Sequence, residues 1–416
     1  MKFYKEENNM EEKNLQPEEG ALRVTKLTLY EAAAIIVGAN IGSGILGLAY
    51  SSRKAGWPIL LLWLIVAGVF TTFSMLYVAE TALRTQKPLQ LPGLAEKYVG
   101  KLGAVLVFIS VVANSMGCMI AYTSGSGNIL CTLLGLPNWA GSLLFTVPCV
   151  LVVWLGLKAT GLWEKFMSTG MVVLLAVIVL ASFLSGKADI SRAVYADWTY
   201  AVPLLSSAIF CYIAQYAVPE LARGMRHTPK KLPVAIIAGM VVTGMLLAIV
   251  PLAVLSLTGA DQVTEVATLA WGHALGTWAL YTANIFALCA MMTSYWAVGG
   301  SMLTNIVDMF KLKDEHDPKT RITAIICTVL PPFILAYGGF VSFVDAIGLA
   351  GTFGGVIMSI VPVLMLNSAR KHSEIEPEWK CGWYAHPAIQ GTIIVVFSLA
   401  AVYFICSMVG ILPAGW

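Results

Sequence analysis

Charged side chains are scarce in this sequence of 416 residues. Only 12% of its residues are Asp, Glu, Lys or Arg, which is about half of the roughly 25% usual in soluble domains. Hydrophobic residues make up 58% of the chain, and the mean hydropathy is +0.78. This composition excludes an ordinary soluble domain and predicts an all-α integral membrane protein.

The common motifs of hydrolytic, metal and nucleotide chemistry are also absent. The eight cysteines form no C-x-x-C pair, and the sequence contains no H-E-x-x-H, G-x-S-x-G or G-K-[ST] motif. The serines in the glycine-rich runs 42–44 and 125–127 have no adjacent base that would activate them. We therefore expect no enzyme activity, no disulfide scaffold and no zinc site.

Long apolar runs fill most of the chain, and a membrane-spanning helix needs about 20 such residues. Eleven segments qualify: 29–52, 57–83, 102–133, 139–157, 163–185, 199–221, 231–257, 269–309, 320–337, 341–368 and 386–409. The eighth is long enough to tilt or to extend beyond the bilayer as one helix. Residues 1–28 are polar and have no signal-peptide core, so we expect them to form a cytoplasmic tail.

The basic residues test this topology. If the N-terminus is cytoplasmic, all but four of the 26 Lys and Arg residues lie on the inner side, the exceptions being Arg53, Lys54, Lys187 and Arg192. This asymmetry satisfies the positive-inside rule and accounts for the slight net charge of +3, which gives no indication of nucleic-acid binding. We expect a multi-pass protein of the plasma membrane, with its N-terminus inside and its C-terminus outside.

The first apolar segment is interrupted at mid-depth by four glycines and an asparagine, in the run Gly38-Ala39-Asn40-Ile41-Gly42-Ser43-Gly44-Ile45-Leu46-Gly47. Glycine weakens a helix interior by roughly 0.5–1 kcal/mol relative to alanine. Irregular backbone within a bilayer is tolerated where it is buried in protein or lines a cavity. The run therefore fits either close helix packing or a broken helix whose free N–H and C=O groups bind a ligand.

The sixth segment has a similar interruption. It carries Ser206, Ser207, Gln215 and an aromatic cluster at mid-depth, with Pro219 near one end. Inverted-repeat transporters interrupt corresponding helices in their two halves, and a five-span repeat pairs the first span with the sixth. The pair favours a binding site over packing alone.

Three motifs together resemble the amino acid/auxin permease group of the amino acid–polyamine–organocation superfamily. They are the G-x-x-x-G-S-G run at 38–44, the run 121–130 (AYTSGSGNIL), and Phe210-Cys211-Tyr212 followed by Pro219-Glu220 and 229–233. The second is similar to bacterial hydroxy- and aromatic-amino-acid permeases. The resemblance implies a LeuT-type fold: five-helix repeats at 29–185 and 199–368, broken helices 1 and 6, and an eleventh helix at 386–409.

The resemblance also implies where an amino acid would bind. The amides that would hold its carboxylate are those of Ser43, Gly44 and Ile45. The carbonyls that would accept from its ammonium group are those of Ala39, Asn40, Phe210 and Cys211. The side chains that would select the substrate, with residues of span 8, are Asn114, Met116, Phe210, Tyr212 and Ile213.

The coupling ion is left open between Na⁺ and H⁺. The resemblance to sodium-coupled relatives implies a cage of carbonyls and hydroxyls from Gly38, Ile41, Ala290, Thr293 and Ser294. A second sodium site is disfavoured, because Ile45 stands where those relatives have an asparagine. No other cofactor is expected.

Proton coupling has arguments on both sides. Proton-coupled relatives place a lysine in helix 5 near the position of Gly170, and the nearest lysine here, Lys165, lies closer to the cytoplasm. Bacterial aromatic-amino-acid permeases, however, are usually proton-driven. Glu80 is a candidate proton carrier because acids within membranes are often functional, although Arg84 one turn away is a natural partner for it.

We therefore predict a secondary active transporter that takes up neutral amino acids, aromatic or small, by alternating access within the lipid bilayer. One alternative is a transport-inactive amino-acid sensor on the same fold. The other is an integral-membrane enzyme, against which the absence of catalytic motifs argues. The sequence does not indicate the oligomeric state.

Overall fold

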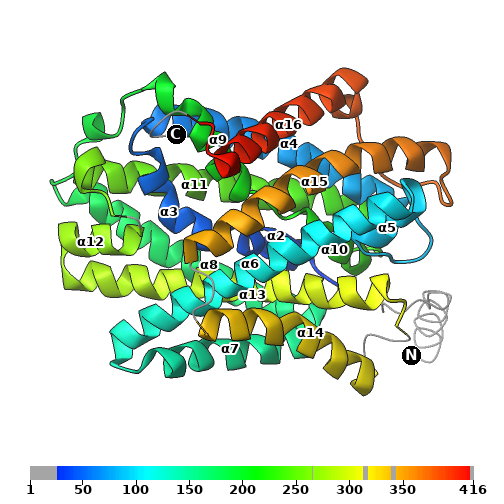
Figure 1. Cartoon of the computed structure of the whole chain (residues 1–416), viewed down its shortest axis with the longest axis horizontal. Helices are drawn as coiled ribbons and strands as arrows, with labels where there is room; N and C mark the ends of the chain where they lie inside the picture. The colour runs from blue at the N-terminus through cyan, green and yellow to red at the C-terminus, as the bar shows by residue number, and fades with distance from the viewer. Residues whose placement is uncertain (1–25, 265, 313–316, 339–342, 413–416) are drawn as a thin grey trace, which may run out of the picture.

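The computed structural model describes residues 26–264, 266–312, 317–338 and 343–412, and within these ranges it contains α- and 3₁₀-helices and no strand. Most helices run along the long axis of one bundle (Figure 1). In that view α16 (Pro387–Val409) lies along one side, and α7 (Asn138–Leu155) and α14 (Pro318–Tyr337) lie along the opposite side. The predicted all-α class is confirmed.

Each of the eleven predicted spans coincides with one helix or with a broken helix. Besides α7, α14 and α16, the long helices are α4 (Trp57–Leu83), α6 (Lys101–Leu134), α8 (Leu157–Leu184), α11 (Leu232–Gln262), α13 (Thr277–Met309) and α15 (Phe343–Lys371). The backbone of α11 is non-helical at Gly259, near its end. In the described part of the chain, seven helical segments are long and apolar enough to cross a membrane, and a bent pair makes an eighth. The number eleven and the division into two repeats stay predictions.

The eighth span is not the single long helix we expected from 269–309. It is divided into α12 (Ala267–Leu275) and α13, and Gly276 between them has a φ of 95°. A positive φ ends a helix, and glycine can adopt it without the steric penalty that a Cβ would bring. Figure 1 shows α12 at the left end of the bundle, opposite α5 (Leu91–Tyr98), a short helix that the sequence reading also missed.

The first span is broken as predicted. Helix α2 (Leu29–Asn40) begins with a capping box, in which Thr28 and Glu31 bond to each other's main-chain N–H groups. It ends at Asn40, and α3 (Ser43–Ser52) continues after a bend of 49°. Gly42 at the break has a ψ of −136°, far from helical values.

The sixth span is broken as well. Helix α9 (Ala201–Phe210) ends before a non-helical stretch, which is followed by the 3₁₀ turn η3 (Gln215–Ala217) and by α10 (Val218–Gly224). Pro219 sits in the first turn of α10, where its missing N–H costs nothing. Helix α3 packs on α9, and α2 packs on η3, so the two breaks lie side by side in the middle of the bundle.

Candidate functional site

A pocket lies where the two broken helices meet. Its lining comes from the first break, the second break and one face of α6, and consists of Ala39, Asn40, Gly42, Gly44, Asn114, Cys118, Tyr122, Phe210, Ile213 and Tyr216. The volume of the cavity among these residues is about 10 Å³. This is room for about one water molecule and far below the roughly 300–1,000 Å³ of typical ligand pockets, so an amino acid can enter only if the lining moves apart.

Six of the predicted substrate residues line this pocket: Ala39, Asn40, Gly44, Asn114, Phe210 and Ile213. Ile45 and Cys211 are buried next to it, and the Sγ of Cys211 would lie 2.8 Å from a Cβ placed at Gly44. Met116 is not part of the lining that the structure describes. The side chain of Ser43 lies outside the described residues, although its backbone begins α3.

Tyr212 faces another way. A Cβ at Gly68 of α4 would lie 3.0 Å from its Cζ, and one at Gly244 of α11 would lie 3.2 Å from its hydroxyl. Its ring therefore packs between α4 and α11, outside the lining of the pocket. This position favours a role in supporting the broken helix.

The backbone at the breaks supplies both kinds of polar group. The first N–H groups of a helix and its last C=O groups have no partner within that helix. The amides at the start of α3 have no side-chain cap, because the N-cap residue, Gly42, has no side chain that could accept a hydrogen bond. The end of α2 brings the carbonyls of Ala39 and Asn40 to the same pocket. One end of the pocket thus suits an anion and the other a cation.

Two tyrosines of the pocket were missed from the sequence. A Cβ at Gly42 would lie 2.7 Å from the hydroxyl of Tyr122 and 2.7 Å from Oγ of Ser294. The hydroxyl of Tyr216 is buried and finds no hydrogen-bond partner in the described part of the chain. Tyr122 could have been found from spacing, because positions 114, 118 and 122 lie on one face of a helix.

Two of the predicted cation ligands, Gly38 and Ser294, are joined to each other next to the pocket. The hydroxyl of Ser294 donates to the carbonyl oxygen of Gly38 at 2.5 Å, and the hydroxyl of Thr293 donates to that of Ala290 at 2.9 Å. All four residues are buried, as is Ile41, whose N–H donates to Val37. Every candidate ligand atom is an oxygen, which is the chemistry that a hard cation prefers.

A buried acid that the sequence reading overlooked lies beside these oxygens. Glu164 of α8 is 0% exposed, and a Cβ at Gly38 would lie only 2.8 Å from its Cδ. Gly170, where we expected helix 5 to face the cation region, is exposed and has no heavy atom within 4 Å of its would-be Cβ. That expectation was wrong by about two turns, and Glu164 holds the inward-facing position.

Glu80 is held in an ion-pair network. Its carboxylate bonds with Arg84 at 2.8 Å, with Arg370 at 2.9 Å and with the main-chain N–H of Cys381 at 2.7 Å. The pairing of Glu80 with Arg84 is thereby confirmed. A proton-carrier role would require this carboxylate to leave two arginines.

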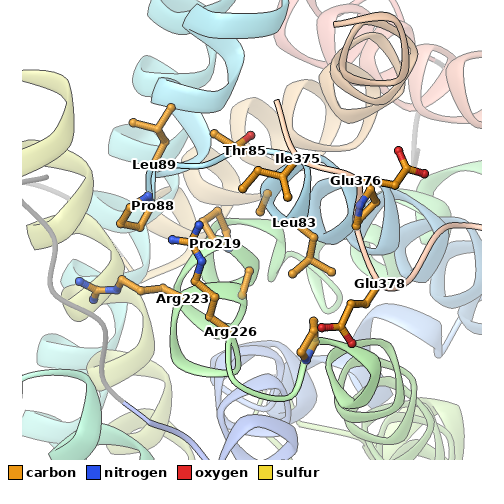
Figure 2. Close-up of a pocket in the computed structure, with 14 residues that line it drawn as sticks. Leu83, Thr85, Pro88, Leu89, Pro219, Arg223, Arg226, Ile375, Glu376 and Glu378 are labelled. Atoms are coloured by element: carbon orange, nitrogen blue, oxygen red, sulfur yellow. The ribbon is translucent and has the colours of Figure 1, made fainter. Parts of the chain in front are cut away.

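A second pocket opens at the end of the bundle that we predict to be cytoplasmic (Figure 2). Its walls come from the end of α4, the segment between α4 and α5, α10 with the residues that follow it, and the loop between α15 and α16. They include Leu83, Leu89, Arg223, Arg226 and Glu378. In the same loop, an ion pair with Lys97 and a hydrogen bond from the Gln86 N–H hold the pKa of Glu374 below its usual value.

Buried polar contacts tie the helices together between this second pocket and the central one. Glu220 of α10 pairs with Arg223 and accepts hydrogen bonds from Gln90 and Thr304. The N–H of Gln90 in turn donates to Asp308 at 2.7 Å. In this conformation α10, α13 and the segment before α5 are joined, and a path between the pockets requires these contacts to part.

Comparisons with known proteins agree with this geometry. The model of the tryptophan/tyrosine permease family matches residues 25–407. The tyrosine-specific transport system 1 of Haemophilus influenzae is 25% identical over 81% of this chain and 87% of its own length. The tryptophan-specific transport protein of the same organism is 26% identical over 83% and 88%. The glutamine transporter 2 of Aliivibrio fischeri is 22% identical over 82% and 89%.

The fold also resembles a solved structure. The crystal structure of MhsT in complex with L-phenylalanine matches with a TM-score of 0.65, covering 93% of this chain and 99% of that one. The sequence identity is 15%, so this likeness concerns the fold.

Proposed function

Because this chain belongs to the tryptophan/tyrosine permease family, we propose that it imports a neutral aromatic amino acid, tryptophan or tyrosine, by alternating access. One observation carries the proposal: the two helix breaks meet in a pocket that has free main-chain groups at its ends and aromatic rings in its wall. The described lining includes no charged side chain. An uncharged substrate side chain suits such a wall.

Each group of the substrate has a counterpart. The carboxylate would accept from the amides at the start of α3, and the ammonium would donate to carbonyls at the ends of α2 and α9. The rings of Phe210, Tyr122 and Tyr216 would surround the substrate side chain, and the free hydroxyl of Tyr216 offers a polar contact to an indole N–H or a phenol. A Cβ at Gly44 would lie 2.8 Å from the Sγ of Cys211, so the carboxylate would need Cys211 and Phe210 to move back from α3.

A cation gradient would drive uptake. The oxygens of Gly38, Ala290, Thr293 and Ser294 fit Na⁺ by their chemistry. The buried Oε1 of Glu164 beside Gly38 has no partner among the described residues, and its carboxyl group, when ionised, would add a negative charge. When bound, the ion would supply a positive charge next to the residues whose carbonyls hold the ammonium. By the distribution of Lys and Arg, the N-terminus and the second pocket would face the cytoplasm.

Uptake of labelled amino acids into proteoliposomes tests this function. Imposed sodium gradients, proton gradients, both or neither would be compared, with competition by each unlabelled amino acid. We expect concentrative uptake under at least one gradient, inhibited most strongly by tryptophan or tyrosine. A transport-inactive sensor or an enzyme would show no uptake, and either result would contradict the proposal.

Substitution of Phe210 tests the pocket itself. Its half-buried ring lies in the wall, and an aromatic pair contributes about 0.5–1.5 kcal/mol beyond simple burial. We expect Phe210→Ala to raise the KM for the aromatic substrate about tenfold with a smaller effect on kcat. Phe166→Ala is the matched control, because that ring is 65% exposed on the outer face of α8. An unchanged KM for Phe210→Ala would place the substrate elsewhere.

A further inference from the structure

The carboxyl group of Glu164 has an unusual environment for a buried acid. It lies two turns inside α8 and is completely buried. Its Oε2 accepts one long hydrogen bond, from Ser168 on the next turn at 3.4 Å, and its Oε1 has no partner among the described residues. An ionised carboxylate buried without a partner is far more costly than a buried neutral polar group. The carboxyl group must therefore either be protonated or have its charge compensated by a partner that these contacts do not include.

No basic side chain in the described part of the chain compensates this charge. Helices α2, α7, α11 and α13 pack against α8. From α2 the neighbouring titratable group is Glu31, whose carboxylate accepts from the N–H of Thr28 at 2.9 Å. Lys165 is exposed and lies over the ring of Tyr30, 5.8 Å from its centroid.

Oxygen atoms, by contrast, gather around it. The carboxyl lies against the Cα of Gly38, where any side chain would displace it. The carbonyl of that same glycine accepts from Ser294, and Thr293 precedes it on α13. Hydroxyl oxygens that donate a hydrogen bond still have lone pairs for a cation. A carboxylate, a carbonyl and the hydroxyl of Ser294 thus converge from three helices on one residue of the first break, and Thr293 is the next residue along α13.

We propose that Glu164 is the anionic ligand of the coupling cation, Na⁺, which it shares with the carbonyl of Gly38 and the hydroxyls of Thr293 and Ser294. The inference rests on the proposed cation-driven transport and names the residue that gives the site its charge. A cation held between α8, α13 and the end of α2 fixes Gly38. The next two residues are Ala39 and Asn40, which line the substrate pocket. Ion binding would therefore order the carbonyls that receive the substrate's ammonium group.

The test is sodium binding to the purified protein in the absence of substrate. Melting temperature would be followed while NaCl replaces choline chloride at constant ionic strength and fixed pH. A ligand that binds the folded state raises the melting temperature in a saturable way, so we expect a sodium-specific rise for the native protein. Glu164→Gln should weaken the apparent sodium affinity by about tenfold or more.

Glu31→Gln is the matched control. It neutralises the other buried glutamate near this part of α8, and glutamine retains the capping box. We expect its sodium response to equal that of the native protein. If Glu164→Gln does not yield folded protein, Glu164→Asp replaces it, because a carboxylate one methylene shorter should also bind sodium more weakly.

Several results would overturn the inference. They are a native protein that does not respond to sodium, a Glu164 variant with native sodium affinity, and a response of the native protein to pH alone, which would assign the site to a proton. The proposed function fails by a different result, the absence of amino-acid uptake under every gradient, so the two failures are distinguishable.

Discussion

Gly42→Ala should reduce transport about a hundredfold while the protein still folds. The added methyl would lie 2.7 Å from the hydroxyls of both Tyr122 and Ser294, closer than carbon and oxygen atoms tolerate. Ser294 is held by the carbonyl of Gly38, and Tyr122 forms part of the pocket wall. The methyl must therefore displace the cation ligands, the pocket or both. A misplacement of about 1 Å in a reacting or binding group can cost about a hundredfold in rate. Initial rates of uptake at several substrate concentrations measure the loss.

Gly300→Ala serves as the control for this substitution. Gly300 lies in α13, the helix that carries Ser294, and a Cβ there meets no heavy atom within 4 Å. We expect native uptake and a slight stabilisation, since alanine favours a helix over glycine. Native transport by Gly42→Ala would contradict the role that we give to the first break.

Glu80→Gln should destabilise the protein by about 3–5 kcal/mol, the usual cost of breaking a buried ion pair by removing one partner. The substitution leaves Arg84 and Arg370 without their shared anion, and the carboxylate is 0% exposed. The measurement is a thermal melt in detergent, together with the pH dependence of uptake by the protein that remains folded. We expect a clear fall in melting temperature and an unchanged pH dependence.

Glu374→Gln provides the comparison for a surface pair. Its carboxylate is 38% exposed and pairs with Lys97, so its loss should cost at most about 1 kcal/mol. A Glu80 variant that melts like the native protein but loses its pH dependence would instead support the proton-carrier role that the sequence left open.

The broken helices could be predicted from the sequence because their signals are local. Gly38, Gly42 and Gly44 interrupt an apolar run within seven residues, and Pro219 marks the start of the helix after the second break. A backbone that cannot stay helical leaves N–H and C=O groups without partners. The sequence therefore predicts both the positions of the breaks and a ligand with charged groups that bind such main-chain atoms. Most of the residues at the breaks that we predicted to bind substrate accordingly line the pocket or lie next to it.

The residues that were missed depend on which way a helix faces. We expected the fifth span to begin at 163, which placed Glu164 at the membrane boundary, whereas α8 begins at Leu157 and carries it inward. Its neighbours Trp163 and Lys165 are exposed, and its contact with Gly38 joins residues far apart in the sequence. Tyr212 is the opposite case: we predicted that it would face the substrate, whereas its ring packs between α4 and α11.

Equilibrium binding of labelled L-tryptophan to the purified protein tests the central claim, that main-chain groups at the two breaks hold both charged groups of the substrate. Unlabelled tryptamine, which has no carboxylate, and indole-3-propionate, which has no ammonium group, would compete against it. Losing a charged hydrogen-bonding partner costs about 1.5–3 kcal/mol. We therefore expect each analogue to bind at least about tenfold more weakly than L-tryptophan. Equal binding by either analogue would contradict the account.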